Sequence, residues 1–235
     1  MMYIDPYRFG SQSLIGSDPY WSNVVSLLHF DQTGSQPAVD ETGRLWNAPT
    51  DGYHAPPSLF GKSAGFLNNT FIITVDNTNL DMGTNDFTLE ISFYSTLSVQ
   101  PGYSILCGSN RYGWGTGATC IGHNPGENFF SFYCYDINVS THVGRWANGY
   151  TPNTWVRLAL VRQGTTFYGF RDGILDWTSI NQVGPVNFGN GNLAIGWSAI
   201  NSVGVNGYVD EFRLTKGVAR YTSSYVIDNN PFPDY

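Results

Sequence analysis

The sequence is poor in charged residues, which make up 12% of its 235 residues, against about 25% in typical soluble proteins. It contains no run of Lys and Arg, and its formal net charge is −7 at pH 7. Proteins that bind nucleic acids need clustered cations along the phosphate backbone. We therefore expect no nucleic-acid partner.

Long apolar runs are also missing. No stretch approaches the roughly 18 consecutive apolar residues of a membrane-spanning helix. The first residues, MMYIDPYRFG, lack the apolar run of a signal peptide. The sequence therefore predicts no membrane association, and synthesis in a cytoplasm.

Cysteine is scarce, with three residues at positions 107, 120 and 134. None belongs to a C-x-x-C pair or to a Cys/His cluster with zinc spacing. Cys107 and Cys134 lie in apolar, strand-like surroundings, which favours reduced, buried thiols, and Cys120 follows a glycine-rich loop. We predict no metal and no cofactor from these residues.

Aromatic and turn-forming residues are abundant. Phe, Trp and Tyr make up 16% of the chain, which also has 27 Gly and 12 Pro. This composition disfavours helices and favours strands joined by tight turns. Turn signals at regular spacing indicate an all-β antiparallel two-sheet sandwich. The expected strands cover residues 24–30, 63–67, 71–75, 86–95, 103–107, 129–135, 154–162, 166–171, 174–177, 193–197 and the start of 207–221.

Alternation along these strands identifies the expected core, because successive side chains of a strand point to opposite faces. Two hairpin turns are predicted, at Gln163-Gly164 and at Asp172-Gly173. The residues expected to face the core are Phe87, Leu89, Ile91, Phe93, Leu158, Leu160, Phe212 and Leu214.

The stretch 207–221, GYVDEFRLTKGVARY, is the most unusual in the chain. Alternation places Tyr208, Asp210, Phe212 and Leu214 on one face of a strand and the intervening residues on the other. Lys216-Gly217 ends this strand, and residues 218–221 fit one short helical turn.

This stretch and its continuation, GYVDEFRLTKGVARYTSSYVIDNNPFP, resemble the closing segment of concanavalin A-like lectin/glucanase domains of the laminin-G-like jelly-roll kind. The segment is particularly similar to the copies of this domain found in structural proteins of tailed bacteriophages. The resemblance implies a jelly roll over residues 24–235 whose first strand lies near its last. It also implies a virion protein, which is a structural, tail or decoration component. Such a protein would have other virion proteins as partners in a homo- or hetero-oligomeric assembly and would bind host-surface carbohydrate.

A glycan-cleaving enzyme is the alternative, because the same superfamily includes glucanases with Glu-x-Asp-x-x-Glu on one strand. That spacing is absent here. Glu90 stands alone, and Asp210 and Glu211 are adjacent, so alternation points them to opposite faces. No Gly-x-Ser-x-Gly elbow or Ser-His-Asp pattern appears. We therefore predict a protein without enzymatic activity and without catalytic residues, although other carboxylates could meet through the fold.

Two loops carry aromatic residues that could contact carbohydrate or a partner protein. Tyr112 and Trp114 lie in the glycine-rich stretch 108–119, and Trp146 and Tyr150 lie in GRWANGYTP. Aromatic rings on loops stack on sugars or anchor interfaces. The alternative, that some of these rings pack back onto the sandwich, has equal weight.

Residues 1–23 form an irregular N-terminal arm, interrupted by Asp-Pro and Gly-Ser breakers. Termini are often disordered, but this segment is unusually aromatic. We expect an arm that docks the domain into a larger assembly. Its candidate contact residues are Tyr3, Tyr7, Phe9, Tyr20 and Trp21.

Lectin-like sandwiches commonly bind calcium. Asp31, Asp40 and Asp210 are the acidic candidates, because the first and last strands are expected to approach each other. The sequence has no EF-hand loop. A turn-capping Asp40 and a structural Asp210 are the preferred interpretations.

Overall fold

The computed structural model describes residues 17–47, 54–68, 72–109, 119–124, 126–134, 142–189, 191–196 and 204–235. Within them the chain forms strands and one short 3-10 helix, η1 (Trp21–Asn23). The strands are β1 (Val24–Leu28), β2 (His54–Ala55), β3 (Ala64–Asn68), β4 (Ile72–Ile73), β5 (Asp81–Gly83), β6 (Phe87–Ser95), β7 (Ile105–Ser109), β8 (Thr119–Gly122), β9 (Ser131–Cys134), β10 (His142–Arg145), β11 (Trp155–Gln163), β12 (Thr166–Arg171), β13 (Ile174–Ser179), β14 (Val186–Asn187), β15 (Leu193–Ile195) and β16 (Asn206–Lys216).

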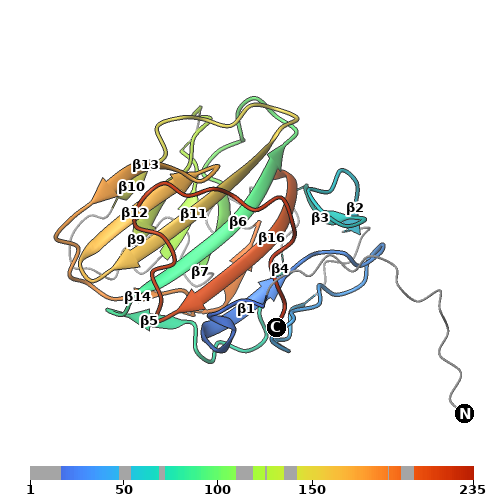
Figure 1. Ribbon diagram of the computed structural model, residues 1–235. Helices are drawn as coiled ribbons and strands as arrows, with labels where there is room; N and C mark the ends of the chain where they lie inside the picture. Colours follow the sequence, from blue (N-terminus) through green and yellow to red (C-terminus); the bar gives the residue numbers. More distant parts are fainter. Residues whose placement is uncertain are drawn as a thin grey trace, which may run out of the picture.

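The strands form two main antiparallel sheets that pack face to face (Figure 1). The larger sheet has eight strands in the order β13-β12-β11-β6-β16-β3-β2, with β1 also paired to β16. The smaller has six strands in the order β10-β9-β8-β7-β15-β4, and β14 and β5 form a separate pair. The predicted all-β jelly-roll sandwich is confirmed. Among the described residues, no helix is long and apolar enough to cross a membrane.

The core lies between the two sheets, and along β6 and β11 alternate residues face it. All eight residues expected to face the core are at most 3% exposed. Phe212 packs edge-on against Trp46, with ring centroids 6.2 Å apart. Cys107 and Cys134 are also buried, as predicted.

The first and last strands are neighbours, as expected, since β1 pairs with the second half of β16. Both predicted hairpins form as well, but the first turn lies at residues 164–165 and not at Gln163-Gly164, because Gln163 still pairs with Thr166. Asp172 and Gly173 join β12 to β13 with φ angles of 50° and 76°, the left-handed pair that a tight hairpin turn requires.

The alternation predicted through β16 is wrong after Val209. The pairing with β6 shifts between Asp210 and Arg213, because β16 contains one extra residue there. Glu211 has a φ of 51°, so this is a β-bulge with one residue in the left-handed region. Val209, Phe212 and Leu214 face the core. The face of the large sheet that points away from the core, called the outer face below, therefore receives both Asp210 and Glu211.

The short helical turn expected at residues 218–221 is also wrong, because these residues have no helical structure. Their polar groups bind the sheet instead. The Thr88 hydroxyl donates to the carbonyl of Val218 at 2.9 Å and accepts from the backbone N–H of Arg220 at 2.9 Å. These bonds replace the ones that a helical turn would make.

Candidate functional site

A buried network of ion pairs lies on the outer face of the large sheet. Arg213 donates through Nε to Glu90 Oε2 at 2.7 Å and through Nη1 to Asp18 Oδ2 at 3.1 Å. Arg220 binds both oxygens of Asp18, at 3.0 and 2.7 Å. Burial opposes ionisation of Asp18, but the bonds from Arg220 prevail and lower the pKa of its carboxyl group. The network therefore joins β6, β16 and both ends of the described chain.

Residues 217–235, called the C-terminal segment below, run over the outer face to the β12–β13 side and back toward β16 and β1 (Figure 1). The segment starts at the end of β16 and reaches the β12–β13 turn, where Tyr225 N–H donates to the Gly173 carbonyl at 2.8 Å. It returns over β11, where Arg157 donates to the Asp228 carbonyl. It ends beside η1, where the N–H of Asp18 donates to the carbonyl of Tyr235 at 2.8 Å.

Two aromatic residues of the C-terminal segment cover one end of the outer face. Tyr221 and Tyr225 stack with ring centroids 3.6 Å apart and planes 7° apart. They pack over the buried Phe170. The Tyr221 hydroxyl also donates to Glu90 Oε1 at 2.9 Å, which attaches this cover to the ion-pair network.

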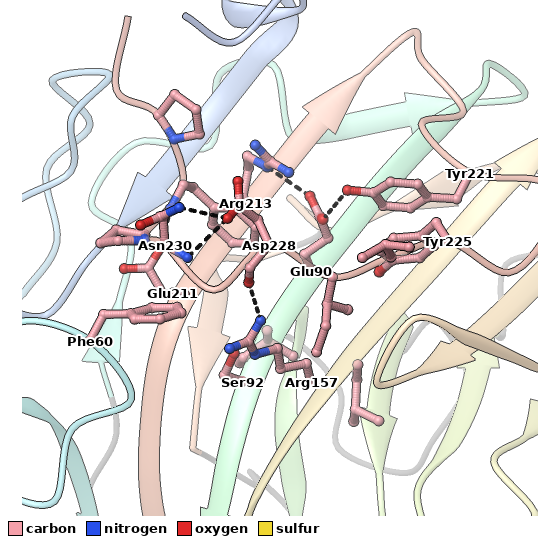
Figure 2. A pocket seen from close by; sticks show the side chains of 17 residues that line it. Phe60, Glu90, Ser92, Arg157, Glu211, Arg213, Tyr221, Tyr225, Asp228 and Asn230 are labelled. Carbon is pink, nitrogen blue, oxygen red and sulfur yellow. Dashed lines mark hydrogen bonds and ion pairs between the residues drawn. The ribbon is translucent and has the colours of Figure 1, made fainter. Parts of the chain in front are cut away.

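Between the C-terminal segment and the sheet lies a pocket of about 280 Å³, called the outer pocket below (Figure 2). Side chains of the sheet form its floor, and the C-terminal segment and Phe60 form its walls. Its polar floor contains Glu90, Ser92, Arg157, Glu211 and Arg213, and its aromatic walls contain Phe60, Tyr221, Tyr225 and Phe232.

Arg157 is the cation of the outer pocket that is least engaged with carboxylates. Its guanidinium lies over the Phe60 ring, 5.0 Å from the centroid, and one of its nitrogens donates to the Asp228 carbonyl. By contrast, Arg213 already binds Glu90 and Asp18. An arginine has five N–H donors, so Arg157 retains donors for a ligand.

The carboxylates near the pocket have structural partners. Glu211 Oε1 accepts from His29 Nδ1 at 2.7 Å, and its Oε2 accepts from the N–H of Phe232 at 2.7 Å. Although burial opposes protonation, the bond to Glu211 raises the pKa of His29. The His29–Glu211 pair thus holds the C-terminal segment against β1 and β16.

Asp210 lies beside the bulge but outside the lining of the pocket. Its Oδ2 accepts from the N–H groups of Leu59 and Phe60, at 2.7 and 3.2 Å, and its Oδ1 accepts from the N–H of Glu211 at 3.0 Å. Burial, and then the charge of Glu211, raise the pKa of Asp210 to about 8. Asp210 positions Phe60 at the pocket wall, which is the structural role expected for it.

The three acidic residues considered for calcium do not form a common site. Asp40 accepts from the Ser26 hydroxyl, the Thr42 N–H and the Trp46 indole, among others. Asp31 accepts from Lys62 N–H at 2.9 Å. Hydrogen-bond donors bind both oxygens of Asp40 and Asp210 and one oxygen of Asp31. The described residues contain no group of three or more potential metal ligands. The residues present therefore do not fit calcium.

The predicted aromatic contact residues divide into two groups. Tyr112 and Trp114 lie outside the described residues. Trp146 and Tyr150 are buried, at 0% and 4% exposure, so their expected place on an exposed surface is wrong. The Trp146 indole donates to the Phe170 carbonyl at 2.9 Å, and Tyr150 packs edge-on against Phe93. The alternative of equal weight, that the rings pack back onto the sandwich, holds for both.

The arm is also only partly described, since Tyr3, Tyr7 and Phe9 lie outside the described residues. Tyr20 is 41% exposed, and Trp21 begins η1. Asp18 is 5% exposed because it lies within the ion-pair network. The expected boundary at residue 23 therefore falls inside a contact with the domain, and residues 17–23 pack with it.

Sequence reasoning did not identify the outer pocket. Arg157 and Phe60 carry no motif, and they meet only because β11 and the 56–63 loop approach the same face. One signal was present. The TKGVARY stretch contains Arg220 and Tyr221, whose partners are Asp18 and Glu90, so its unusual composition reflects contacts with the outer face.

Two packed antiparallel sheets with crossing connections define a lectin-like jelly-roll sandwich. The chain belongs to the concanavalin A-like lectin/glucanases superfamily, whose model matches residues 67–220. No curated protein matches the chain.

Solved structures of low identity share the fold. Domain 4 of AbnA, an extracellular arabinanase from Geobacillus stearothermophilus, in complex with arabinotriose, is 16% identical with a TM-score of 0.62, covering 84% of this chain and 94% of that one. The binding domain of botulinum neurotoxin DC in complex with rat synaptotagmin II is 16% identical, with a TM-score of 0.59 and coverages of 89% and 50%.

A third structure comes from work on botulinum neurotoxin type C, whose cell entry depends on interaction with two ganglioside molecules. It is 16% identical, with a TM-score of 0.58 and coverages of 89% and 50%. This chain spans about half the length of the toxin binding domains that it matches.

Proposed function

We propose that this chain is a non-enzymatic carbohydrate-binding component of a tailed-phage virion and that the outer pocket holds the sugar. The observation that carries the proposal is the lining of this pocket, which combines aromatic walls with hydrogen-bonding groups. Sugar-binding sites need both, because rings stack on the apolar faces of sugars while polar groups bind their hydroxyls.

The fold neighbours support the carbohydrate part of this proposal. The arabinanase domain, which this chain matches over most of both lengths, is in complex with arabinotriose. Botulinum neurotoxin type C interacts with gangliosides, although a related binding domain is in complex with a protein receptor. For this chain, we expect the ligand to be a glycan of the host surface.

The hydrogen bonds of the carboxylates support the non-enzymatic part. A retaining glycosidase needs one carboxylate free to attack and a second, protonated group beside the scissile bond. Glu90 binds Arg213 and Tyr221, and Glu211 binds His29 and Phe232. The bulge does bring carboxylates to one face, which the alternation argument had excluded. Their partners nonetheless favour a positioning role, and glycan cleavage remains the alternative that the assay below tests.

The virion part rests on the resemblance of residues 207–233 to closing segments of tailed-phage structural proteins. In this proposal, residues 1–16 dock the domain onto other virion proteins within an oligomeric assembly, and the protein reaches the particle from the host cytoplasm. Immunogold labelling of purified particles tests this part. Label at a fixed position on the capsid or tail is the expected result. Particles that carry no label, although the antibody detects the protein in the lysate they came from, would refute it.

The carbohydrate part is tested with the purified chain on an array of bacterial surface polysaccharides and β-glucans, followed by calorimetry. Losing a hydrogen bond to a charged group costs about 1.5–3 kcal/mol. Arg157→Ala should therefore weaken binding about 10- to 100-fold. The matched control is Arg145→Ala, which removes the same charge from β10 on the other sheet and should leave affinity unchanged.

Three outcomes would contradict these expectations. Absence of binding to any polysaccharide removes the carbohydrate function. Equal losses in the Arg157→Ala and Arg145→Ala variants place the sugar elsewhere. Reducing ends that accumulate with the wild-type chain, and not with Glu211→Gln, show that the protein is a glycosidase.

A further inference from the structure

A second group of aromatic residues lies on the outer face, at the end that Tyr221 and Tyr225 do not cover. Strand pairing places Tyr94 of β6 opposite Trp155 of β11 and opposite Tyr208 of β16. The ring centroids of Tyr94 and Trp155 are 5.5 Å apart, and those of Tyr94 and Tyr208 are 5.7 Å apart. These three residues, which cross the central strands of the sheet, are called the aromatic row below.

The aromatic row faces away from the core. Its neighbours along the strands, Phe93, Val156 and Val209, belong to the main core cluster, so alternation points the row outward. All three side chains remain partly exposed. Phe170, which lies under the C-terminal segment on the same face, is 0% exposed by contrast. Partly exposed Tyr and Trp residues combine an apolar face with a polar tip.

The aromatic row continues directly from the outer pocket. Trp155 is two residues from Arg157, and Tyr94 is two residues from Ser92, and both Arg157 and Ser92 line the pocket. Residues two apart on a strand point to the same face and lie about 7 Å apart. The pocket floor and the row are therefore adjacent strips of one surface.

The size of the pocket indicates why this continuity matters. Its volume of about 280 Å³ lies just below that of small-molecule sites, which span roughly 300–1,000 Å³. A pocket of this size encloses a short part of a polysaccharide, and the rest of the chain must leave along the adjoining surface. The aromatic row offers ring faces along that surface, and sugar rings stack on such faces.

We propose that the outer pocket and the aromatic row are successive subsites for one linear oligosaccharide. The pocket binds one end through hydrogen bonds, and Trp155 with its two tyrosine neighbours stacks on the following sugar units. This inference rests on the proposed carbohydrate function. It adds that the ligand is a chain of several sugars rather than a single sugar or a branched tip.

The test compares affinity with chain length. The probes are cello-, xylo- and arabino-oligosaccharides of one to five units, together with size-fractionated fragments of any polysaccharide bound on the array. For the wild-type protein we expect affinity to rise at least about tenfold between one and four units. In Trp155→Ala the rise should disappear while binding of the shortest bound fragment persists. Trp155→Tyr, which keeps a ring, should restore most of the rise.

Two controls separate binding from folding. Tyr168→Ala removes an aromatic residue from β12 of the same sheet, where it stacks with Phe170 away from the row. It should leave the length dependence intact. Melting temperatures identify any variant that is destabilised, and Tyr208→Ser replaces Trp155→Ala if that variant fails to fold.

The outcomes distinguish this inference from the proposed function. Binding of short and long probes with equal affinity overturns the inference alone, as does a length dependence that survives Trp155→Ala. A wild-type dimer in sedimentation that Trp155→Ala dissociates would make the row an interface between copies, which also overturns it. Failure to bind any probe of any length removes the proposed carbohydrate function as well.

Discussion

The two faces of strand β6 are built by different rules. Toward the core, Phe87, Leu89, Ile91 and Phe93 are buried by neighbours of one chemical kind, and any well-packed apolar partner stabilises them. On the outer face, Glu90 needs Arg213 and Tyr221 as specific partners. The inner face depends on a pattern, whereas the outer face depends on individual pairs.

The pairs of the outer face come from distant parts of the chain. Asp18 lies 195 residues before its partner Arg213, and Tyr221 lies 131 residues after its partner Glu90. Both ends of the described chain therefore meet over the central strands. Arg213 and Tyr221 therefore hold distant parts of the chain together and also line the outer pocket.

The inner face can be tested by deleting one large side chain. Phe212→Ala should lower the free energy of unfolding by about 3–5 kcal/mol, because this ring is 0% exposed and its loss leaves a cavity. Val226→Ala is the control, since Val226 is 96% exposed, and it should change stability by less than about 0.5 kcal/mol. Chemical denaturation measures both. A near-neutral Phe212→Ala would remove this residue from the core.

The outer face can be tested by removing one charge of its network. Asp18→Ala should cost about 3 kcal/mol, because Arg213 loses one of its two carboxylates and Arg220 keeps only a long ion pair with Glu90, at 4.0 Å. Deleting residues 1–16 leaves Asp18 in place and should not change the denaturation midpoint, whereas deletion through residue 20 should lower it as Asp18→Ala does. Equal midpoints for the two deletions would show that Asp18 contributes nothing.

The His29–Glu211 pair gives the outer face a dependence on pH. The folded-state pKa of His29 is raised, so its contribution is fully present below the unfolded value of about 6.5 and is lost as pH rises through the folded value. His29→Gln should therefore cost about 2 kcal/mol near pH 5.5 and progressively less toward pH 8.5. Urea denaturation of both proteins across this range measures the difference. A difference that grows with pH would contradict the pairing.

The sequence predicted the inner face well and the outer face poorly, for a physical reason. Alternation is a local property, so Leu89 and Leu158 could be assigned to the core from their neighbours alone. The bulge at Glu211 was not visible, because it depends on how β16 pairs with β6. The same holds for Trp146, for which the sequence left exposure and burial equally open, because its indole donates to the carbonyl of Phe170 on a distant strand.

The resemblance of the closing segment predicted the fold for a related reason. Residues such as Arg220 and Tyr221 bind specific partners on the sheet, so their order is constrained and readable as a motif. The outer pocket was not readable, because Phe60 and Arg157 come from a loop and a strand with no shared pattern.

The most direct test of the outer face as the sugar-binding surface is the indole N–H spectrum of the seven tryptophans. Each signal is assigned by a Trp→Phe substitution, and the protein is titrated with the longest oligosaccharide that it binds. We predict that the Trp155 signal shifts with the ligand while those of the buried Trp46 and Trp146 stay in place. A shift at Trp114 with Trp155 unchanged would place the sugar on the 108–119 loop and contradict the proposed site.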